Sequence, residues 1–141
     1  MPRTVAMAVN LPGSPARLYR MYLDPKQHAA VTGAPVKIAA KAGAKFEAFG
    51  GALTGTVLQV VPNRLIVQSW RSTNFGRRDL DSTLVLSFWP DQGGGRIELM
   101  HVNVADRDFA GVSQGWTKYY WVPWREYLTR PKKRIVASAS D

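Results

Sequence analysis

Alternating apolar and polar or small positions mark strands along most of the chain. Val5, Met7 and Val9 alternate with other residues in this way, which predicts a first strand over 4–9. Further strands are predicted at close intervals, over 36–40, 44–49, 53–61, 64–72, 82–90 and 96–104. Short, turn-rich connections such as Pro62-Asn63 separate them. Connections of this kind are hairpin signals, so the sheet is predicted to be an antiparallel meander.

Two short helices are predicted between the first and second strands. Ser14-Pro15 and Asp24-Pro25 each place a good N-cap residue before a proline at the first helical position. They predict helices over 16–23 and about 25–31, the second of which ends before Gly33. Two brief helices in tandem are poor bundle formers, so they are expected to close one end of the sheet.

The last predicted helix is the most aromatic part of the chain. Residues 114–128 hold three of the five tryptophans and three of the five tyrosines. Asp106 and Asp108 are candidate caps for its start, and Pro123 predicts a kink because it removes one helical hydrogen bond. At about 100° per residue, one broad face collects Phe109, Val112, Trp116, Tyr119, Tyr120, Pro123, Trp124 and Tyr127. A face this bulky requires a large curved partner, which predicts a long helix gripped by the sheet, with room for a ligand.

Length and composition set the broad class of protein. The 141 residues suit a single domain, predicted over 1–128, followed by a basic tail over 129–141 that is expected to be disordered. The absence of cysteine excludes disulfides and cysteine-ligated metal sites. No apolar run approaches the length of a membrane-spanning helix, and residues 1–11 lack the core of a signal peptide. A cytoplasmic domain without membrane insertion is therefore expected.

The net charge of +9 raises the question of a nucleic-acid partner. The basic residues are scattered along the chain, whereas a nucleic-acid groove concentrates them on one element with interleaved aromatic residues. No specific nucleic-acid partner is therefore expected.

Several ordered motifs carry a resemblance to a known family. They are Gly43-Ala44-Lys45-Phe46, Gly50-Gly51 with Gly55, Val61-Pro62, Leu65 through Trp70-Arg71, and Gln114-Gly115-Trp116 with Tyr119-Tyr120. In this order the chain resembles the SRPBCC (START-like) superfamily, and specifically domains similar to the C-terminal domain of the heat-shock protein 90 ATPase activator. The resemblance implies an α+β helix-grip fold with a cavity between sheet and helix. Superfamily members use this cavity for lipids, steroids, polyketides or other hydrophobic molecules, and some catalyse cyclisation there.

Two strand faces supply polar candidates for such a cavity. Gln68 shares a face with its apolar neighbours in strand 64–72, and His101 and Asn103 do so in strand 96–104. If these faces look toward the helix, the cavity candidates are Ile66, Gln68, Trp70, Leu99, His101, Asn103, Trp116, Tyr119 and Tyr120. The alternative is that the polar groups form satisfied hydrogen bonds in the core and that the tryptophans are core residues.

Trp121 falls roughly opposite the apolar helix face, between Lys118 and Arg125. An exposed tryptophan flanked by cations is typical of a partner surface. The alternative is a tryptophan covered by the two cationic side chains in a cation–π contact.

Catalytic and metal-binding motifs are weak in this sequence. His28 and His101 show no HxxxH or HExxH spacing, so no metal or other cofactor is expected, and no catalytic residue is assigned. The preferred hypothesis is a non-enzymatic carrier or sensor for a hydrophobic or aromatic small molecule. The first alternative is a protein-binding module that regulates a heat-shock protein 90-type chaperone. A cyclase-type enzyme is the second, with His101 as acid–base beside Tyr119 or Tyr120.

Overall fold

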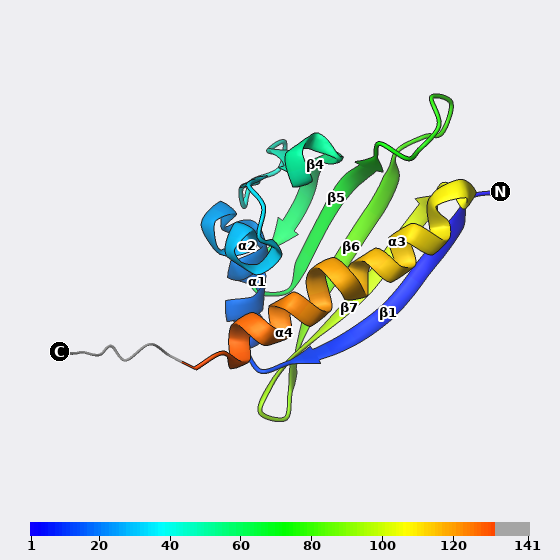
Figure 1. Cartoon of the computed structure of the whole chain (residues 1–141). Helices are drawn as coiled ribbons and strands as arrows, with labels where there is room; N and C mark the ends of the chain where they lie inside the picture. Colours follow the sequence, from blue (N-terminus) through cyan, green and yellow to red (C-terminus); the bar gives the residue numbers. More distant parts are fainter. Residues whose placement is uncertain (132–141) are drawn as a thin grey trace.

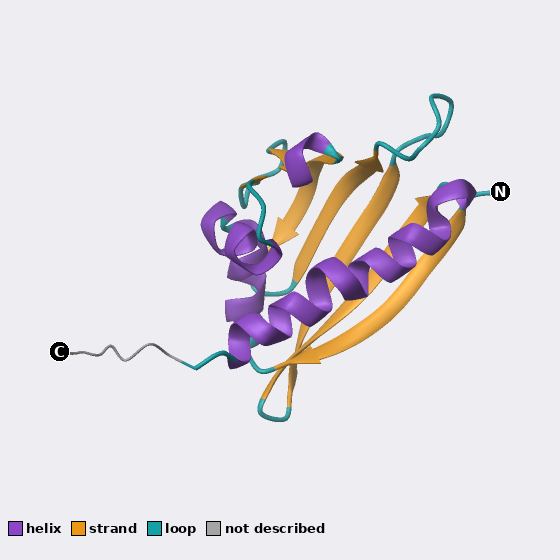
Figure 2. Ribbon diagram, in the orientation of Figure 1, coloured by secondary structure: helices purple, strands orange, loops and turns teal. Residues whose placement is uncertain are grey.

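The computed structural model describes residues 1–131, in which a curved sheet carries a long helix across one face (Figures 1 and 2). All strand pairings are antiparallel, in the spatial order β1-β7-β6-β5-β4-β3-β2. The strands are β1 (Arg3–Leu11), β2 (Val36–Lys37), β3 (Lys45–Ala48), β4 (Leu53–Val61), β5 (Leu65–Ser72), β6 (Ser82–Asp91) and β7 (Gly94–Val104). The predicted helix-grip fold is confirmed.

The two short helices, α1 (Pro15–Leu23) and α2 (Pro25–Thr32), form where the cap-and-proline signals place them. The Ser14 hydroxyl accepts a hydrogen bond from the Arg17 N–H at 3.1 Å, and the Asp24 carboxylate accepts one from the Lys26 N–H at 2.9 Å. Helix α1 packs on β6 and β7, whereas α2 contacts the C-terminal helix. Together they close one end of the sheet (Figure 1).

The C-terminal helix runs without interruption through α3 (Phe109–Gly115), the π-helical segment η3 (Trp116–Trp121) and α4 (Val122–Thr129). The Val122 N–H bonds the Thr117 carbonyl five residues earlier, not the one four residues earlier. An α-helical turn at this point would press the Pro123 ring against the carbonyl of Tyr119. The wider π-helical turn thus accommodates the proline within a continuous helix (Figure 2).

The core lies between the concave face of the sheet and the helices. In register, Ile66 pairs with Leu86 and Leu86 with Leu99, and all three are buried. Gln68 and His101 lie on the same concave face and are also fully buried. The predicted inward direction is therefore correct for Ile66, Gln68, Leu99 and His101.

The predicted basic tail over 129–141 falls mostly outside the described residues, which end at Pro131. Within residues 1–131, none of the helices combines the length and the apolar character that crossing a bilayer requires.

Candidate functional site

An open cleft of about 460 Å³ lies where the first turns of the C-terminal helix pass the paired ends of β4 and β5. The short turn η1 (Phe49–Gly51), which precedes β4, contributes to the same cleft. Five of its lining residues are aromatic: Phe49, Trp70, Trp116, Tyr119 and Tyr120. The others are Ala52, Leu53, Ser72, Thr73, Asn74, Asp108, Gly111, Val112 and Gly115. The cleft is thus mainly apolar, with polar residues gathered at the end of β5 and the start of α3.

Two glycines leave space on the helix side of the cleft. Gly111 and Gly115 are one turn apart and both line it. A Cβ atom at Gly111 would lie 2.9 Å from the Asp108 carboxylate, whereas a Cβ at Gly115 would meet only the Tyr119 ring at 3.6 Å. Glycine within a helix costs roughly 0.5–1 kcal/mol relative to alanine. At Gly115 a Cβ would make an ordinary van der Waals contact with this ring and no clash.

Phe49 forms part of the cleft wall from a strained backbone conformation. Its φ of 53° lies in the left-handed region, which a bulky residue rarely adopts. The next two residues, Gly50 and Gly51, also have positive φ values of 67° and 92°. This backbone directs the Phe49 ring toward the helix, where it lies 5.6 Å from the Tyr119 ring and 6.3 Å from the Tyr120 ring. Strain of this kind costs about 1–3 kcal/mol and is concentrated at ligand clamps and active sites.

The polar end of the cleft is built from Ser72, Asn74 and Asp108. The Ser72 hydroxyl accepts a hydrogen bond from the Asn74 backbone N–H at 3.0 Å. The Asn74 side-chain amide points to Asp108 and donates to its carboxylate over a long 3.4 Å. Asp108 occupies the N-cap position of α3, as predicted, but its side chain makes no capping hydrogen bond.

Of the predicted cavity residues, Trp70, Trp116, Tyr119 and Tyr120 line the cleft. Ile66, Gln68, Leu99 and His101 are buried in the core and do not line it.

Asn103 also lies outside the cleft lining, and its predicted inward direction is wrong. Its φ of 61° interrupts the strand alternation on which that prediction depended. The pairing of β1 with β7 is irregular at the same place. The Asn103 side chain instead donates to the carbonyl of Asp81 at 3.1 Å.

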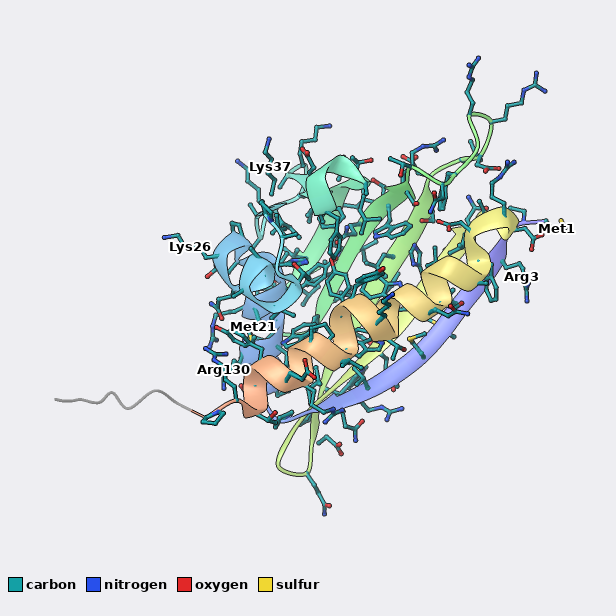
Figure 3. The ribbon with its side chains drawn as sticks, viewed as in Figure 1. Met1, Arg3, Met21, Lys26, Lys37 and Arg130 are labelled. Atoms are coloured by element: carbon teal, nitrogen blue, oxygen red, sulfur yellow. The ribbon has the colours of Figure 1, made fainter. Side chains whose placement is uncertain are left out.

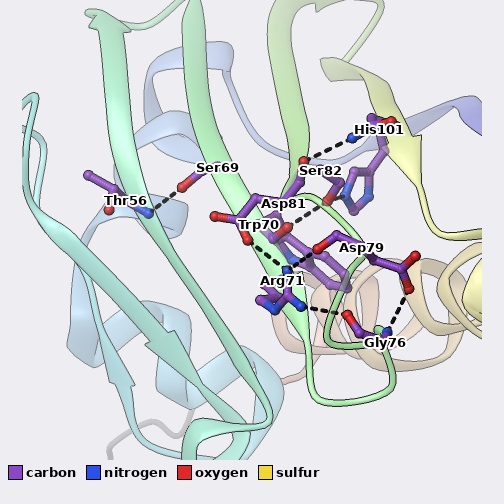
Figure 4. A network of polar contacts seen from close by, with 10 residues as sticks. Thr56, Ser69, Trp70, Arg71, Gly76, Asp79, Asp81, Ser82 and His101 are labelled. Atoms are coloured by element: carbon purple, nitrogen blue, oxygen red, sulfur yellow. Dashed lines mark hydrogen bonds and ion pairs between the residues drawn. The ribbon is translucent and has the colours of Figure 1, made fainter. Parts of the chain in front are cut away.

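His101 is a hydrogen-bonded core residue (Figure 4). The Trp116 indole N–H donates to its Nδ1 at 3.1 Å, and its Nε2 lies 2.8 Å from the Ser82 hydroxyl. Because an indole can only donate, Nδ1 must accept and the proton must sit on Nε2. The Ser82 hydroxyl in turn donates to the Trp70 carbonyl at 2.7 Å. Burial lowers the pKa of His101 to about 3, so the ring stays neutral with both nitrogens occupied.

A second buried polar cluster joins α1, α2, β5 and the C-terminal helix. The Tyr22 hydroxyl donates to the Gln68 side-chain carbonyl at 2.8 Å. His28 Nδ1 lies 2.7 Å from the Tyr22 carbonyl and therefore donates, which leaves Nε2 to accept from the Tyr120 hydroxyl at 2.8 Å. Burial lowers the pKa of His28 to about 4 and raises the pKa of Tyr120 well above its ordinary value. The Gln68 side-chain NH₂ finds no partner within the described part of the chain.

Sequence reasoning missed the roles of Tyr22 and His28 in this cluster. The sequence does contain one signal for His28. It is three residues before the apolar Val31, which puts both on one face of α2, and these are the two buried residues of that helix.

Trp121 is buried, with 6% of its surface exposed, so both interpretations of it as an exposed or cation-covered residue are wrong. Its indole N–H donates to the Met7 sulfur at 3.0 Å. Lys118 lies over the Tyr119 ring instead, at 5.3 Å, and Arg125 donates to the Asn10 carbonyl. The two cations therefore remain on the surface without forming a patch around Trp121.

The loop between β5 and β6 is held by Arg71 (Figure 4). Its guanidinium donates to the Gly76 carbonyl at 2.8 Å and the Asp79 carbonyl at 2.7 Å, and it pairs with Asp81 at 3.1 Å. Asp79 also pairs with Arg107 at 3.3 Å, which links the loop to the start of the C-terminal helix. These carboxylates act as structural anchors of the loop.

Basic residues elsewhere are dispersed, as the sequence predicts. In Figure 3, Arg3 on β1, Lys26 on α2, Lys37 on β2 and Arg130 after the end of α4 lie apart from one another around the rim of the molecule. Across residues 1–131, the acidic and histidine side chains form no group of three that is arranged to hold a metal ion.

Residues 12–128 match the family described as "Activator of Hsp90 ATPase homolog 1-like protein". The chain belongs to this family. It is 28% identical over 108 residues to the human "Activator of 90 kDa heat shock protein ATPase homolog 1", a match that covers 77% of this chain and 32% of the human protein. The chain therefore spans about a third of the length of the curated relatives it matches.

Solved structures agree with the fold of this family member. An Hsp90 activator from Plasmodium falciparum superposes with a TM-score of 0.80 at 20% identity, covering 92% of this chain and 99% of that one. A protein in the dynemicin biosynthetic locus superposes with a TM-score of 0.73 at 14% identity, covering 89% of this chain and 47% of that one. At these identities the likeness concerns the fold alone.

Proposed function

We propose that this protein is a non-enzymatic binding protein that holds a hydrophobic or aromatic small molecule in the cleft between the sheet and the C-terminal helix. The observation that carries the proposal is the cleft itself, whose volume of about 460 Å³ lies within the usual range for small-molecule sites. Its five aromatic rings offer flat apolar surfaces, and a few polar groups at one end can fix the orientation of a ligand.

The hydrogen bonds of the candidate acid–base groups favour binding over catalysis. Both ring nitrogens of His101 are engaged, by Ser82 and Trp116, and His101 does not line the cleft. The Tyr120 hydroxyl donates its hydrogen bond to His28 Nε2. These groups rigidify the wall of the cleft, and a general acid–base role would require breaking their core hydrogen bonds.

The cleft can be filled from the helix side with little structural cost. The Cβ of Gly115→Leu meets only the Tyr119 ring, at an ordinary contact distance, and replaces a glycine at a helical position, so the variant is expected to fold at least as stably as the wild type. Ala110→Leu is the matched control, because Ala110 is exposed on the same helix and does not line the cleft.

Native mass spectrometry with a library of fatty acids, sterols, flavonoids and naphthalene derivatives tests the proposal. The wild type and Ala110→Leu are expected to retain a ligand that Gly115→Leu binds at least about tenfold more weakly, a loss of about 1.4 kcal/mol. Failure of the wild type to bind any library member, or equal binding by Gly115→Leu, would contradict the proposal.

A second candidate is regulation of an Hsp90-type chaperone through direct protein contact. Family membership and the 28% identity to the human activator support it. The anchored β5–β6 loop offers a contact surface, because Leu80 is 76% exposed beside the exposed Arg77 and Arg78.

An ATPase assay with an Hsp90-type chaperone tests this second function. Wild type is expected to raise the hydrolysis rate, and the combined Arg77→Ala, Arg78→Ala and Leu80→Ala variant to lose that effect, while Gly115→Leu retains it. An unchanged rate with the wild type would remove this candidate.

A further inference from the structure

Among residues 1–131, Asp108 is the one acidic residue that lines the cleft. Only 8% of the residue is exposed, and it lies against Gly111, the glycine position where a Cβ would come within 2.9 Å of its Oδ1. The missing side chain at Gly111 is therefore what leaves room for the carboxylate on the cleft side of the helix.

The carboxylate of Asp108 has few partners within the protein. It makes no capping bond to its own helix, and its side-chain contact with Asn74 is a long one at 3.4 Å. The basic residues close to it in the structure form ion pairs with other acidic residues: Arg107 with Asp79 at 3.3 Å, and Arg3 with Asp106 at 3.7 Å. Across the described residues, no lysine, arginine or histidine forms an ion pair with Asp108.

Buried carboxylates are normally paired or bonded by several donors, because removing a charge from water is costly. A charge left with one long hydrogen bond at the polar end of an aromatic cleft is suited to a ligand that supplies the missing donor. A protonated amine does so with a charge-assisted hydrogen bond, the stronger kind.

We propose that the cleft selects an aromatic ligand that carries a protonated amine, with the ring system among Trp70, Trp116 and Tyr119 and the ammonium group on Asp108. This inference rests on the proposed small-molecule function and specifies its ligand class. The faces of the aromatic rings add to the preference, because they attract cations and repel anions.

Three probes with one ring system and different head groups test the inference: naphthalene-1-methylamine, naphthalene-1-methanol and naphthalene-1-carboxylic acid. Dissociation constants are measured at neutral pH by protein-observed NMR titration. The wild type is expected to bind the amine at least about tenfold more tightly than the acid, with the alcohol between them. This comparison needs no variant and therefore does not depend on the stability of one.

Two isosteric variants then assign the preference to one carboxylate. Asp108→Asn is expected to reduce the amine-to-acid ratio to within about threefold. Asp106→Asn removes the same charge two residues away on an exposed side chain, and is expected to leave the ratio unchanged.

The outcomes separate the inference from the function on which it rests. Equal binding of the three probes by the wild type would overturn the inference and leave the small-molecule function standing. An equal change of the ratio in both variants would also overturn it, because the preference would then reflect overall charge. Binding of no probe and no other aromatic compound would count against the small-molecule function itself.

Discussion

Trp116 and Trp121 stack with their ring centroids 5.5 Å apart and their planes 24° apart, although they are five positions apart on one helix. In a regular α-helix, residues with this spacing point about 140° apart. The π-helical hydrogen bonding of η3 joins residues five apart and so brings the two side chains onto one face. Trp121 continues the stack to Trp124, with a centroid distance of 6.1 Å.

This burial predicts a large stability loss for Trp121→Ala. Truncation of a buried tryptophan typically costs 3–5 kcal/mol, so the free energy of unfolding should fall by about that amount in urea denaturation. Tyr119→Ala, two residues earlier and 48% exposed, is the comparison and should lose less than half as much. A loss near 0.5 kcal/mol for Trp121→Ala would indicate an exposed side chain and contradict the stack.

The two buried histidines predict that stability falls in mild acid. The pKa is lowered by burial to about 4 for His28 and about 3 for His101, from an ordinary value of 6.5. Well above pH 6.5 both rings are neutral in the folded and the unfolded chain, so neither makes stability depend on pH. As the pH falls below 6.5, only the unfolded chain takes up protons, and each histidine lowers the free energy of unfolding by up to about 1.4 kcal/mol per pH unit.

Urea denaturation between pH 6.5 and 4.5 measures this slope. His101→Gln should remove roughly half of the pH slope of the free energy of unfolding. This expectation does not depend on how the variant changes stability at pH 7. Because carboxyl groups titrate alike in both proteins, the difference in slope reports the histidine. Identical slopes would mean that His101 takes up its proton at the same pH in the folded and the unfolded chain, which would contradict its burial.

The hydrogen bond between Tyr22 and Gln68 predicts strong coupling between the two residues. Gln68→Met leaves the buried Tyr22 hydroxyl without its acceptor, and Tyr22→Phe leaves the Gln68 carbonyl without its donor. Each single change should cost about 1–3 kcal/mol because it leaves one buried partner unsatisfied, whereas the double variant leaves neither partner unsatisfied and should cost less than the sum. A double-mutant cycle is expected to give a coupling energy of about 1–2 kcal/mol, and additive losses would contradict the bond.

The strained backbone at Phe49 predicts a separation of stability from binding. Phe49→Gly removes the ring contacts with Tyr119 and Tyr120 but relieves the positive φ, so the two effects offset each other to within about 1 kcal/mol. Ligand affinity should nevertheless fall severalfold, because one wall of the cleft is lost. Comparable losses of stability and affinity would assign Phe49 a purely structural role.

The fold followed from the sequence because its signals are local. Alternation placed the strands, and the cap-and-proline pairs at Ser14 and Asp24 placed the short helices. The end of the strand predicted over 44–49 is wrong by one residue, since the strand ends at Ala48. Phe49 has a left-handed backbone, and the periodicity of apolar residues does not reveal such a change.

The candidate site was predictable only in part. Trp70, Trp116, Tyr119 and Tyr120 were found because their apolar faces follow regular periods. The burial of Trp121 was missed because the prediction assumed 100° per residue through a π-helical segment. The N-cap position of Asp108 follows from a local signal, but its contact with Asn74 joins residues 34 positions apart, which no local pattern reveals.

The indole N–H resonances of the five tryptophans provide the most direct test that the cleft binds an aromatic ligand. Trp70 and Trp116 line the cleft, whereas Trp89 is exposed outside it and Trp124 is buried away from it. In a titration of labelled protein with naphthalene-1-methylamine, saturable shifts are predicted for Trp70 and Trp116, with Trp89 and Trp124 nearly unmoved and much smaller shifts in Gly115→Leu at the same ligand concentration. Shifts that are absent, confined to Trp89, or unchanged in Gly115→Leu would contradict a ligand in this cleft.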